Sequence, residues 1–93
     1  MKARSLIRRR VAVGHGMFAD LVVWELPQPL AGSEHPFKYR LAFVMDGRCV
    51  LRYDNETGKG DHRHIGEKEH PYSFTTPDQL MADFFKDIQQ VKR

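Results

Sequence analysis

The sequence has a single cysteine, Cys49, so no disulfide can form within the chain and a disulfide-stapled secreted fold is excluded. No stretch approaches the roughly 18 consecutive apolar residues that a membrane-spanning helix needs. Arginines interrupt the N-terminal segment where a signal peptide would be apolar. We therefore expect a cytoplasmic protein without membrane contact, in which Cys49 is a small buried side chain of a strand.

The sequence also lacks internal repeats and low-complexity segments, and its 93 residues leave room for one modest hydrophobic core. The residues are 41% hydrophobic and 29% charged, which is typical of a globular protein and not of a disordered one. The net charge of +3 is too small to identify a partner. We expect a single domain over residues 1–93.

Alternation of apolar and polar residues predicts four strands, over residues 3–13, 17–26, 37–45 and 48–54. The last two strands meet at Asp46-Gly47. A three-residue turn that includes Met45 keeps apolar and charged residues on separate faces, so we prefer it to a two-residue turn. In this register Phe43 faces Cys49, and Arg40 lies directly across from Arg52.

A C-terminal helix is predicted from its start signal and its periodicity. Thr76 is the expected N-cap, Pro77 occupies the first helical position and Gln79 completes a capping box. An apolar stripe at helical spacing then needs an apolar surface to cover. The predicted fold is α+β, a four-stranded antiparallel meander with one C-terminal helix packed on one face. The stripe comprises Leu80, Met81, Phe84, Phe85, Ile88 and Val91.

The face that the helix leaves open is expected to be rich in basic side chains. Two facing arginines repel each other, and an anionic partner would remove that cost. Basic residues interleaved with aromatic ones suit single-stranded RNA, which they bind through phosphate contacts and base stacking. Solubility alone also explains such residues, and Asp20 can pair with Arg10 across the first hairpin. The candidate RNA-binding residues are Arg8, Arg10, Trp24, Lys38, Arg40 and Arg52.

The candidate catalytic stretch follows a Gly-Lys-Gly bend and reads Asp61-His62-Arg63-His64. In an extended segment His62 and His64 point to the same side, about 6–7 Å apart. Two such imidazoles can act on opposite sides of one phosphate, one taking the proton of a ribose 2′-hydroxyl and the other protonating the leaving 5′-oxygen. Lys59 and Arg63 would hold the phosphate and Asp61 would orient a histidine.

Two other interpretations use the same residues. His62 and His64 with Asp61 or Asp54 have a spacing compatible with metal binding, although no full ligand set can be named. The acidic and amide side chains of this stretch are also common turn formers, and the histidines would then be ordinary surface residues. We assign no metal and no cofactor.

Five segments spread over nearly the whole chain carry a family resemblance: Leu21–Trp24, Lys38–Leu41, Arg52–Glu56, Gly58–His64 and Pro71–Phe74. They resemble the TumE family of small bacterial toxins. The resemblance implies a growth-inhibiting toxin that a helix-turn-helix antitoxin of the TumA type neutralises, and it implies no particular catalytic mechanism.

Together these observations predict the toxin of a type II toxin–antitoxin pair that acts on RNA as a metal-independent ribonuclease. The alternatives are a growth inhibitor that binds RNA or protein without cleaving it, and an inactive member that only binds its antitoxin. The first alternative predicts toxicity that survives loss of both histidines and fails on charge reversal at Arg40 or Arg52.

Overall fold

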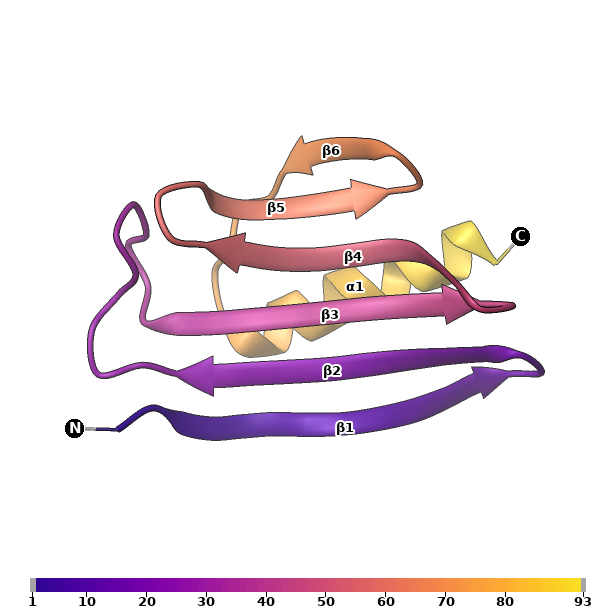
Figure 1. Ribbon diagram of the computed structural model, residues 1–93, viewed down its shortest axis with the longest axis horizontal. Helices are drawn as coiled ribbons and strands as arrows, with labels where there is room; N and C mark the ends of the chain where they lie inside the picture. Colours follow the sequence, from indigo (N-terminus) through magenta and orange to yellow (C-terminus); the bar gives the residue numbers. More distant parts are fainter. Residues whose placement is uncertain (1, 93) are drawn as a thin grey trace.

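The computed structural model describes residues 2–92 as a six-stranded antiparallel sheet with one helix across one face (Figure 1). The strands lie in chain order, so each is joined to the next as a hairpin. The α+β class, the antiparallel meander and the C-terminal helix are confirmed, whereas the predicted strand count of four is wrong. The elements are β1 (Arg4–Gly14), β2 (Met17–Glu25), β3 (Phe37–Met45), β4 (Arg48–Glu56), β5 (Gly60–Ile65), β6 (Lys68–Pro71) and α1 (Pro77–Val91).

The two additional strands, β5 and β6, carry polar side chains on both faces and therefore lack the alternation that identifies a half-buried strand. In the sequence, only glycines indicate the turns that begin and end β5. Gly58 between β4 and β5 has φ of 80°, and Gly66 between β5 and β6 has φ of 61°, a region that side chains disfavour. The histidine stretch is thus the fifth strand of the sheet and not a loop beside it.

The β3–β4 hairpin has a two-residue turn, so the predicted three-residue turn is wrong. Asp46 and Gly47 both have positive φ, 52° and 79°, as a type I′ turn requires. A bulge then shifts the pairing by one residue, so that Phe43 faces Leu51 and Val44 faces Cys49. The bulge keeps the apolar faces aligned. The two-residue turn places Cys49 opposite Val44 and not opposite Phe43, and the expected burial of Cys49 is wrong, because its side chain is exposed.

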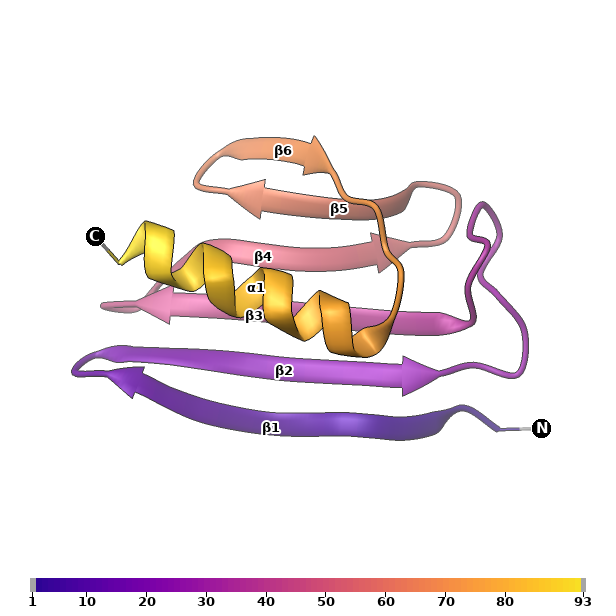
Figure 2. The same ribbon diagram turned by 180° about the vertical axis from the view of Figure 1, so that it is seen from behind.

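The core lies between α1 and one face of the sheet. The Thr76 hydroxyl accepts the Gln79 backbone N–H at 3.1 Å, which confirms the predicted N-cap. Figure 2 shows α1 lying across β3 and β4. The buried members of its stripe, Leu80, Phe84 and Ile88, pack on this face, and burial of each contributes roughly 2 kcal/mol. The buried sheet residues beneath α1 include Val23, Tyr39, Leu41, Phe43, Leu51 and Tyr53.

The opposite face of the sheet is left uncovered and is called the open face below. Within residues 2–92, no helix is both long enough and apolar enough to cross a membrane.

Candidate functional site

The predicted catalytic residues are divided between the two faces of β5. Register pairs Arg63 with the buried Tyr53, while His62 faces Asp54 and His64 faces Arg52. Because successive side chains of a strand alternate between faces, Asp61 and Arg63 point toward the α1 side. His62 and His64 lie together on the open face, as the sequence predicts, and Asp61 and Arg63 do not join them there.

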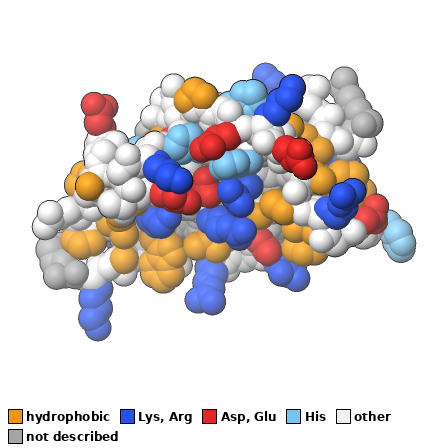
Figure 3. Space-filling model, turned by 45° about the horizontal axis from the view of Figure 1, so that its top comes forward, with side chains coloured by type: hydrophobic (Ala, Val, Ile, Leu, Met, Phe, Trp, Pro, Cys, Tyr) orange, Lys and Arg blue, Asp and Glu red, His pale blue; other side chains and the backbone are white. Residues whose placement is uncertain are grey.

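Pairing along the sheet aligns the open-face side chains in two transverse rows. At the end of both rows toward β6 lies a cluster from β4, β5 and β6 that we call the histidine cluster. Figure 3 shows histidine, acidic and basic side chains gathered over this part of the sheet. The first row contains Arg8, Val22, Arg40, Asp54 and His62, and the second Arg10, Asp20, Ala42, Arg52, His64 and Glu69. The histidine cluster comprises Arg52, Asp54, His62, His64 and Glu69.

Both imidazoles of the histidine cluster point toward one carboxylate oxygen. Glu69 Oε1 lies 3.6 Å from His62 Nε2 and 4.0 Å from His64 Nε2. These separations exceed hydrogen-bond length, so the carboxylate is not locked in place. The Glu69 side chain is 52% exposed and those of the histidines 22% and 25%. A half-exposed carboxylate therefore lies where two partly shielded imidazoles converge.

Arg52 and Asp54 form the other half of the histidine cluster. Arg52 Nε lies 3.1 Å from Asp54 Oδ2, an ion pair whose alignment leaves the buried Nε–H without a hydrogen bond. Asp54 Oδ1 lies 3.7 Å from His64 Nε2. Arg40 faces Asp54 across the strand pair, and Arg52 faces Ala42. The predicted juxtaposition of Arg40 with Arg52 is therefore wrong, and repulsion between them supplies no argument for an anionic partner.

The remaining basic residues of the open face differ in whether they form ion pairs with carboxylates. Arg8 and Arg40 are exposed, and among residues 2–92 no carboxylate pairs with either; with Val22 they line a cavity of about 440 Å³. Arg10 instead pairs with Asp20 through two hydrogen bonds of 2.7 and 3.1 Å, which confirms that alternative for Arg10. Arg8 and Arg40 are thus the more available phosphate contacts.

Lys38 and Trp24 lie opposite each other at the far end of the open face. The Lys38 ammonium donates to the Asn55 carbonyl oxygen at 2.5 Å, so this lysine is tied to the end of β4. Trp24 is half-buried. Lys59 occupies the β4–β5 turn, where its ammonium lies 3.7 Å from the Glu56 carboxylate and remains largely exposed. Lys59 is therefore outside the histidine cluster.

Arg63 holds the helix to the sheet. Its guanidinium donates to Asp87 Oδ2 of α1 at 3.0 Å, and the Tyr53 hydroxyl donates to the same oxygen. The hydrogen bond with Tyr53 raises the pKa of Arg63, against the effect of its burial. Burial, and then the hydrogen bond to Asp87, raises the pKa of Tyr53.

Asp61 does orient a histidine, but it is His35 and not His62 or His64. Asp61 Oδ2 lies 2.8 Å from His35 Nε2 and accepts the Tyr39 hydroxyl at 2.5 Å. Burial, followed by this hydrogen bond, raises the pKa of Tyr39 well above its usual value. Asp61 thereby links β5 to β3 and to the β2–β3 loop.

With this geometry in place, the chain was compared with known proteins. The family model described as Toxin TumE matches residues 2–92. The chain belongs to the TumE toxin family. No curated protein and no solved structure gives a significant match. Membership of the TumE family supports a toxin role and implies an antitoxin partner.

Sequence reasoning missed two residues that the TumE chain brings into contact with predicted ones. Glu69 was found only through the β5–β6 hairpin, and the turn at Gly66 is the signal that would have placed it across from His64. His35 lies in the β2–β3 loop, and its side chain is only 15% exposed. No local pattern indicates its contact with Asp61, which is 26 positions away.

The metal interpretation finds no ligand set in this TumE chain. Among residues 2–92, no group of three or more His, Cys, Asp or Glu side chains is arranged to hold a metal ion. Of the proposed ligands, Asp61 lies on the α1 side, away from the two histidines.

Proposed function

We propose that the chain is the toxin of a type II toxin–antitoxin pair, acts on cytoplasmic RNA as a metal-independent ribonuclease, and is neutralised by a helix-turn-helix antitoxin. The observation that carries the ribonuclease proposal is the convergence of His62 Nε2 and His64 Nε2 on one Glu69 oxygen. A carboxylate oxygen held between two imidazoles marks a position that a phosphate oxygen of RNA can take.

The two histidines carry out both proton transfers of the proposed reaction. The ribose 2′-oxygen attacks the adjacent phosphorus while one imidazole accepts the 2′-hydroxyl proton. The bond from phosphorus to the 5′-oxygen breaks, and the other imidazole donates a proton to that oxygen. The products are a 2′,3′-cyclic phosphate and a 5′-hydroxyl, and the histidines have exchanged protonation states.

Arginines of the open face supply the positive charge that this chemistry requires. Arg52 is adjacent to His64 across the β4–β5 pair and can meet the charge that grows on the phosphate. Arg40 and Arg8 extend the basic surface away from the histidine cluster and would bind the neighbouring phosphates, with Lys38 and Trp24 farther along. Lys59, exposed in its turn, is a further phosphate contact.

The test is cleavage of single-stranded RNA in the presence of EDTA. We expect the wild type to cleave, and His62→Ala and His64→Ala each to lower the rate by about 10²–10⁴-fold, the usual size of an acid–base contribution. His15→Ala is the matched control, because His15 is an exposed histidine in the β1–β2 turn. Its rate should equal that of the wild type.

Two outcomes would contradict the proposal. Cleavage that disappears with EDTA and returns with a divalent cation would assign the chemistry to a metal. Cleavage at the wild-type rate by both alanine variants would show that the histidines do not take part in the reaction.

A second candidate, binding without cleavage, is favoured by one observation. Each histidine of the cluster already lies near a carboxylate, whereas neither Arg8 nor Arg40 forms an ion pair with a carboxylate of residues 2–92. An inhibitor that blocks RNA by occupancy would depend on these arginines. It predicts toxicity that persists in the double His62→Ala/His64→Ala variant and is lost in Arg40→Glu.

A further inference from the structure

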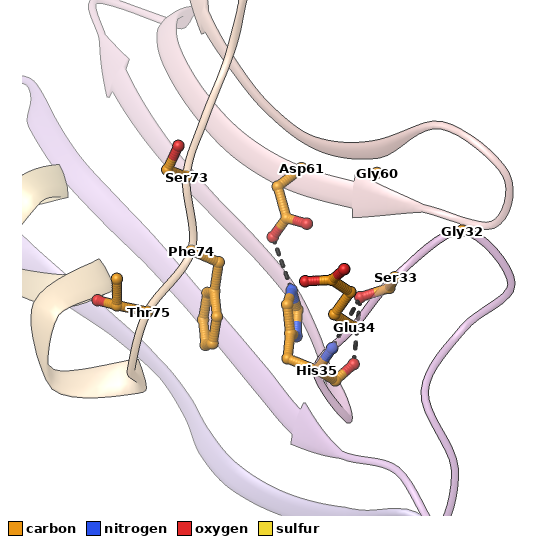
Figure 4. Close-up of a pocket in the computed structure, with 9 residues that line it drawn as sticks. All are labelled: Gly32, Ser33, Glu34, His35, Gly60, Asp61, Ser73, Phe74 and Thr75. Atoms are coloured by element: carbon orange, nitrogen blue, oxygen red, sulfur yellow. Dashed lines mark hydrogen bonds and ion pairs between the residues drawn. The ribbon is translucent and has the colours of Figure 1, made fainter.

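A second cavity lies at the end of the sheet, where three segments meet. The β2–β3 loop, the start of β5 and the segment between β6 and α1 enclose about 590 Å³ (Figure 4). Gly60 and Asp61 supply the β5 wall. The cavity is distinct from the histidine cluster, because Asp61 and His62 point to opposite faces of the same strand. The loop supplies residues 32–35 and the third segment supplies residues 73–75.

Backbone contacts fix the walls of this cavity before any ligand arrives. The Gly58 N–H donates to the Ala31 carbonyl oxygen at 2.7 Å, which ties the β2–β3 loop to the β4–β5 turn. A Cβ at Gly32 would lie only 3.2 Å from Gly58 Cα, so the close approach needs glycine there. The Tyr72 N–H donates to the Asp61 carbonyl oxygen at 3.1 Å and fixes the third segment. A preformed cavity spares a ligand the cost of ordering the protein.

One wall of the cavity is aromatic. The His35 and Phe74 rings stack with their centroids 3.9 Å apart. The Tyr39 ring also stacks with Phe74, at a centroid distance of 5.6 Å. Figure 4 shows both rings at the edge of the cavity, below the Asp61 carboxylate. A planar group can pack against such a wall.

The charges of the cavity are negative. Asp61 and Glu34 both line it, and no lysine or arginine does. His35 does not neutralise them, because its Nδ1 accepts the Phe37 backbone N–H at 3.2 Å, which leaves Nε2 to donate to Asp61. Asp61 Oδ2 thus receives two hydrogen bonds, whereas Oδ1 has no hydrogen-bond partner among residues 2–92. The hydroxyls of Ser33, Ser73 and Thr75 add further acceptors.

We propose that this cavity binds the guanidinium group of an arginine side chain from a protein partner. A guanidinium is planar, cationic and rich in N–H donors, and therefore matches a free carboxylate oxygen, a second carboxylate, hydroxyl acceptors and an aromatic wall. A phosphate or nucleotide would meet two carboxylates here and no cation. The inference does not depend on ribonuclease activity.

The test is a titration of the isotope-labelled protein with Nα-acetyl-arginine amide, followed by amide chemical shifts in NMR. We expect shifts confined to residues 32–35, 60–61 and 73–75. Glu34→Gln, an exposed position that the fold does not need, should weaken binding about three- to tenfold, and Asp61→Asn should weaken it further. Glu67→Gln is the matched control, because Glu67 is exposed in the β5–β6 turn, outside the cavity.

Three results would overturn the inference. Equal binding of Nα-acetyl-lysine amide would show a site for any cation. Local shifts with guanosine monophosphate in place of the arginine amide would show a nucleotide pocket. Absence of local shifts with the arginine amide, or unchanged binding in Glu34→Gln, would show that the cavity does not recognise a guanidinium.

Discussion

The two sides of β5 have opposite tasks within one strand of six residues. On the α1 side, Asp61 and Arg63 are engaged with side chains of the β2–β3 loop, β3 and the helix through hydrogen bonds of 3.0 Å or less. On the open side, His62 and His64 have only looser contacts with carboxylates, of 3.6 Å or more. Tight bonding stabilises a fold, while loosely held imidazoles remain able to bind and to transfer protons.

This contrast teaches that neighbouring ionisable residues need not form one site. Four consecutive charged or titratable residues suggest a single catalytic group, but strand alternation sends them to opposite faces. Changes on the open side should therefore affect activity alone, and changes on the α1 side should affect stability first.

The largest expected effect is on cleavage by the double variant His62→Ala/His64→Ala. The rate should fall by at least about 10³-fold, because both proton transfers are lost. The free energy of unfolding in urea should stay within about 0.5 kcal/mol of the wild type, since neither imidazole makes a hydrogen bond to another of residues 2–92. A large loss of stability would erase the proposed difference between the two sides.

The next effect is on stability, at Asp61. Asp61→Ala should lower the free energy of unfolding by about 2–4 kcal/mol, because the buried Tyr39 hydroxyl and His35 Nε2–H both lose their acceptor. Urea denaturation measures it. Asp20→Ala is the control: this aspartate pairs with Arg10 on the surface, and its loss should change stability far less. Equal losses of unfolding free energy in the two variants would show that Asp61 has no special structural role.

Alkaline pH should also destabilise the α1 side. Burial first, and then the neighbouring carboxylates, raises the pKa of Tyr39 and of Tyr53 above the usual value of about 10. Both hydroxyls stay protonated in the folded protein and ionise near pH 10 in the unfolded chain. Their contribution to stability is therefore complete below about pH 10 and is lost as pH rises above it. Tyr53→Phe should lower the free energy of unfolding by about 1–2 kcal/mol at neutral pH and make its decrease above about pH 10 less steep.

Urea denaturation at a series of pH values from 8 to 11 measures the stability of the wild type and of Tyr53→Phe, and the absorbance of tyrosinate is the second readout. Ionisation of Tyr39 and Tyr53 near pH 10 while the protein is still folded would contradict it.

The smallest effect is expected at Glu69. Glu69→Gln removes the anion that occupies the proposed phosphate position, so the KM for RNA should fall by about two- to fivefold. Glu67→Gln removes an equal charge from the neighbouring turn and serves as the control. A KM that rises, or that falls equally in the control, would mean that Glu69 does not compete with RNA.

Much of this fold follows from local patterns in the sequence. Alternation identifies β1 to β4, and Thr76 with the apolar stripe identifies α1. The patterns fail at β5, whose inward-facing Asp61 and Arg63 are polar because they bond to Asp87, His35 and Tyr39 instead of entering an apolar core. They also fail at β6, which is only four residues long. The turn at Asp46-Gly47 was misassigned because the bulge that restores the register leaves no trace in the pattern.

The candidate site was predicted in part for the same reasons. The placement of His62 with His64 on one face follows from alternation alone. Three other contacts depend on register and on loops distant in the sequence. They are the approach of both imidazoles to the Glu69 carboxylate, the pairing of Arg52 with Asp54 and the hydrogen bond between Asp61 and His35.

The central claim is that two open-face histidines cleave RNA through attack of the 2′-hydroxyl, and the chemical ends of the products test it most directly. RNA digested by the purified protein in EDTA should carry 2′,3′-cyclic phosphate and 5′-hydroxyl ends, and a substrate with 2′-deoxyribose at the cleaved position should stay intact. Products with 5′-phosphate ends, or cleavage of the deoxy substrate, would contradict the account.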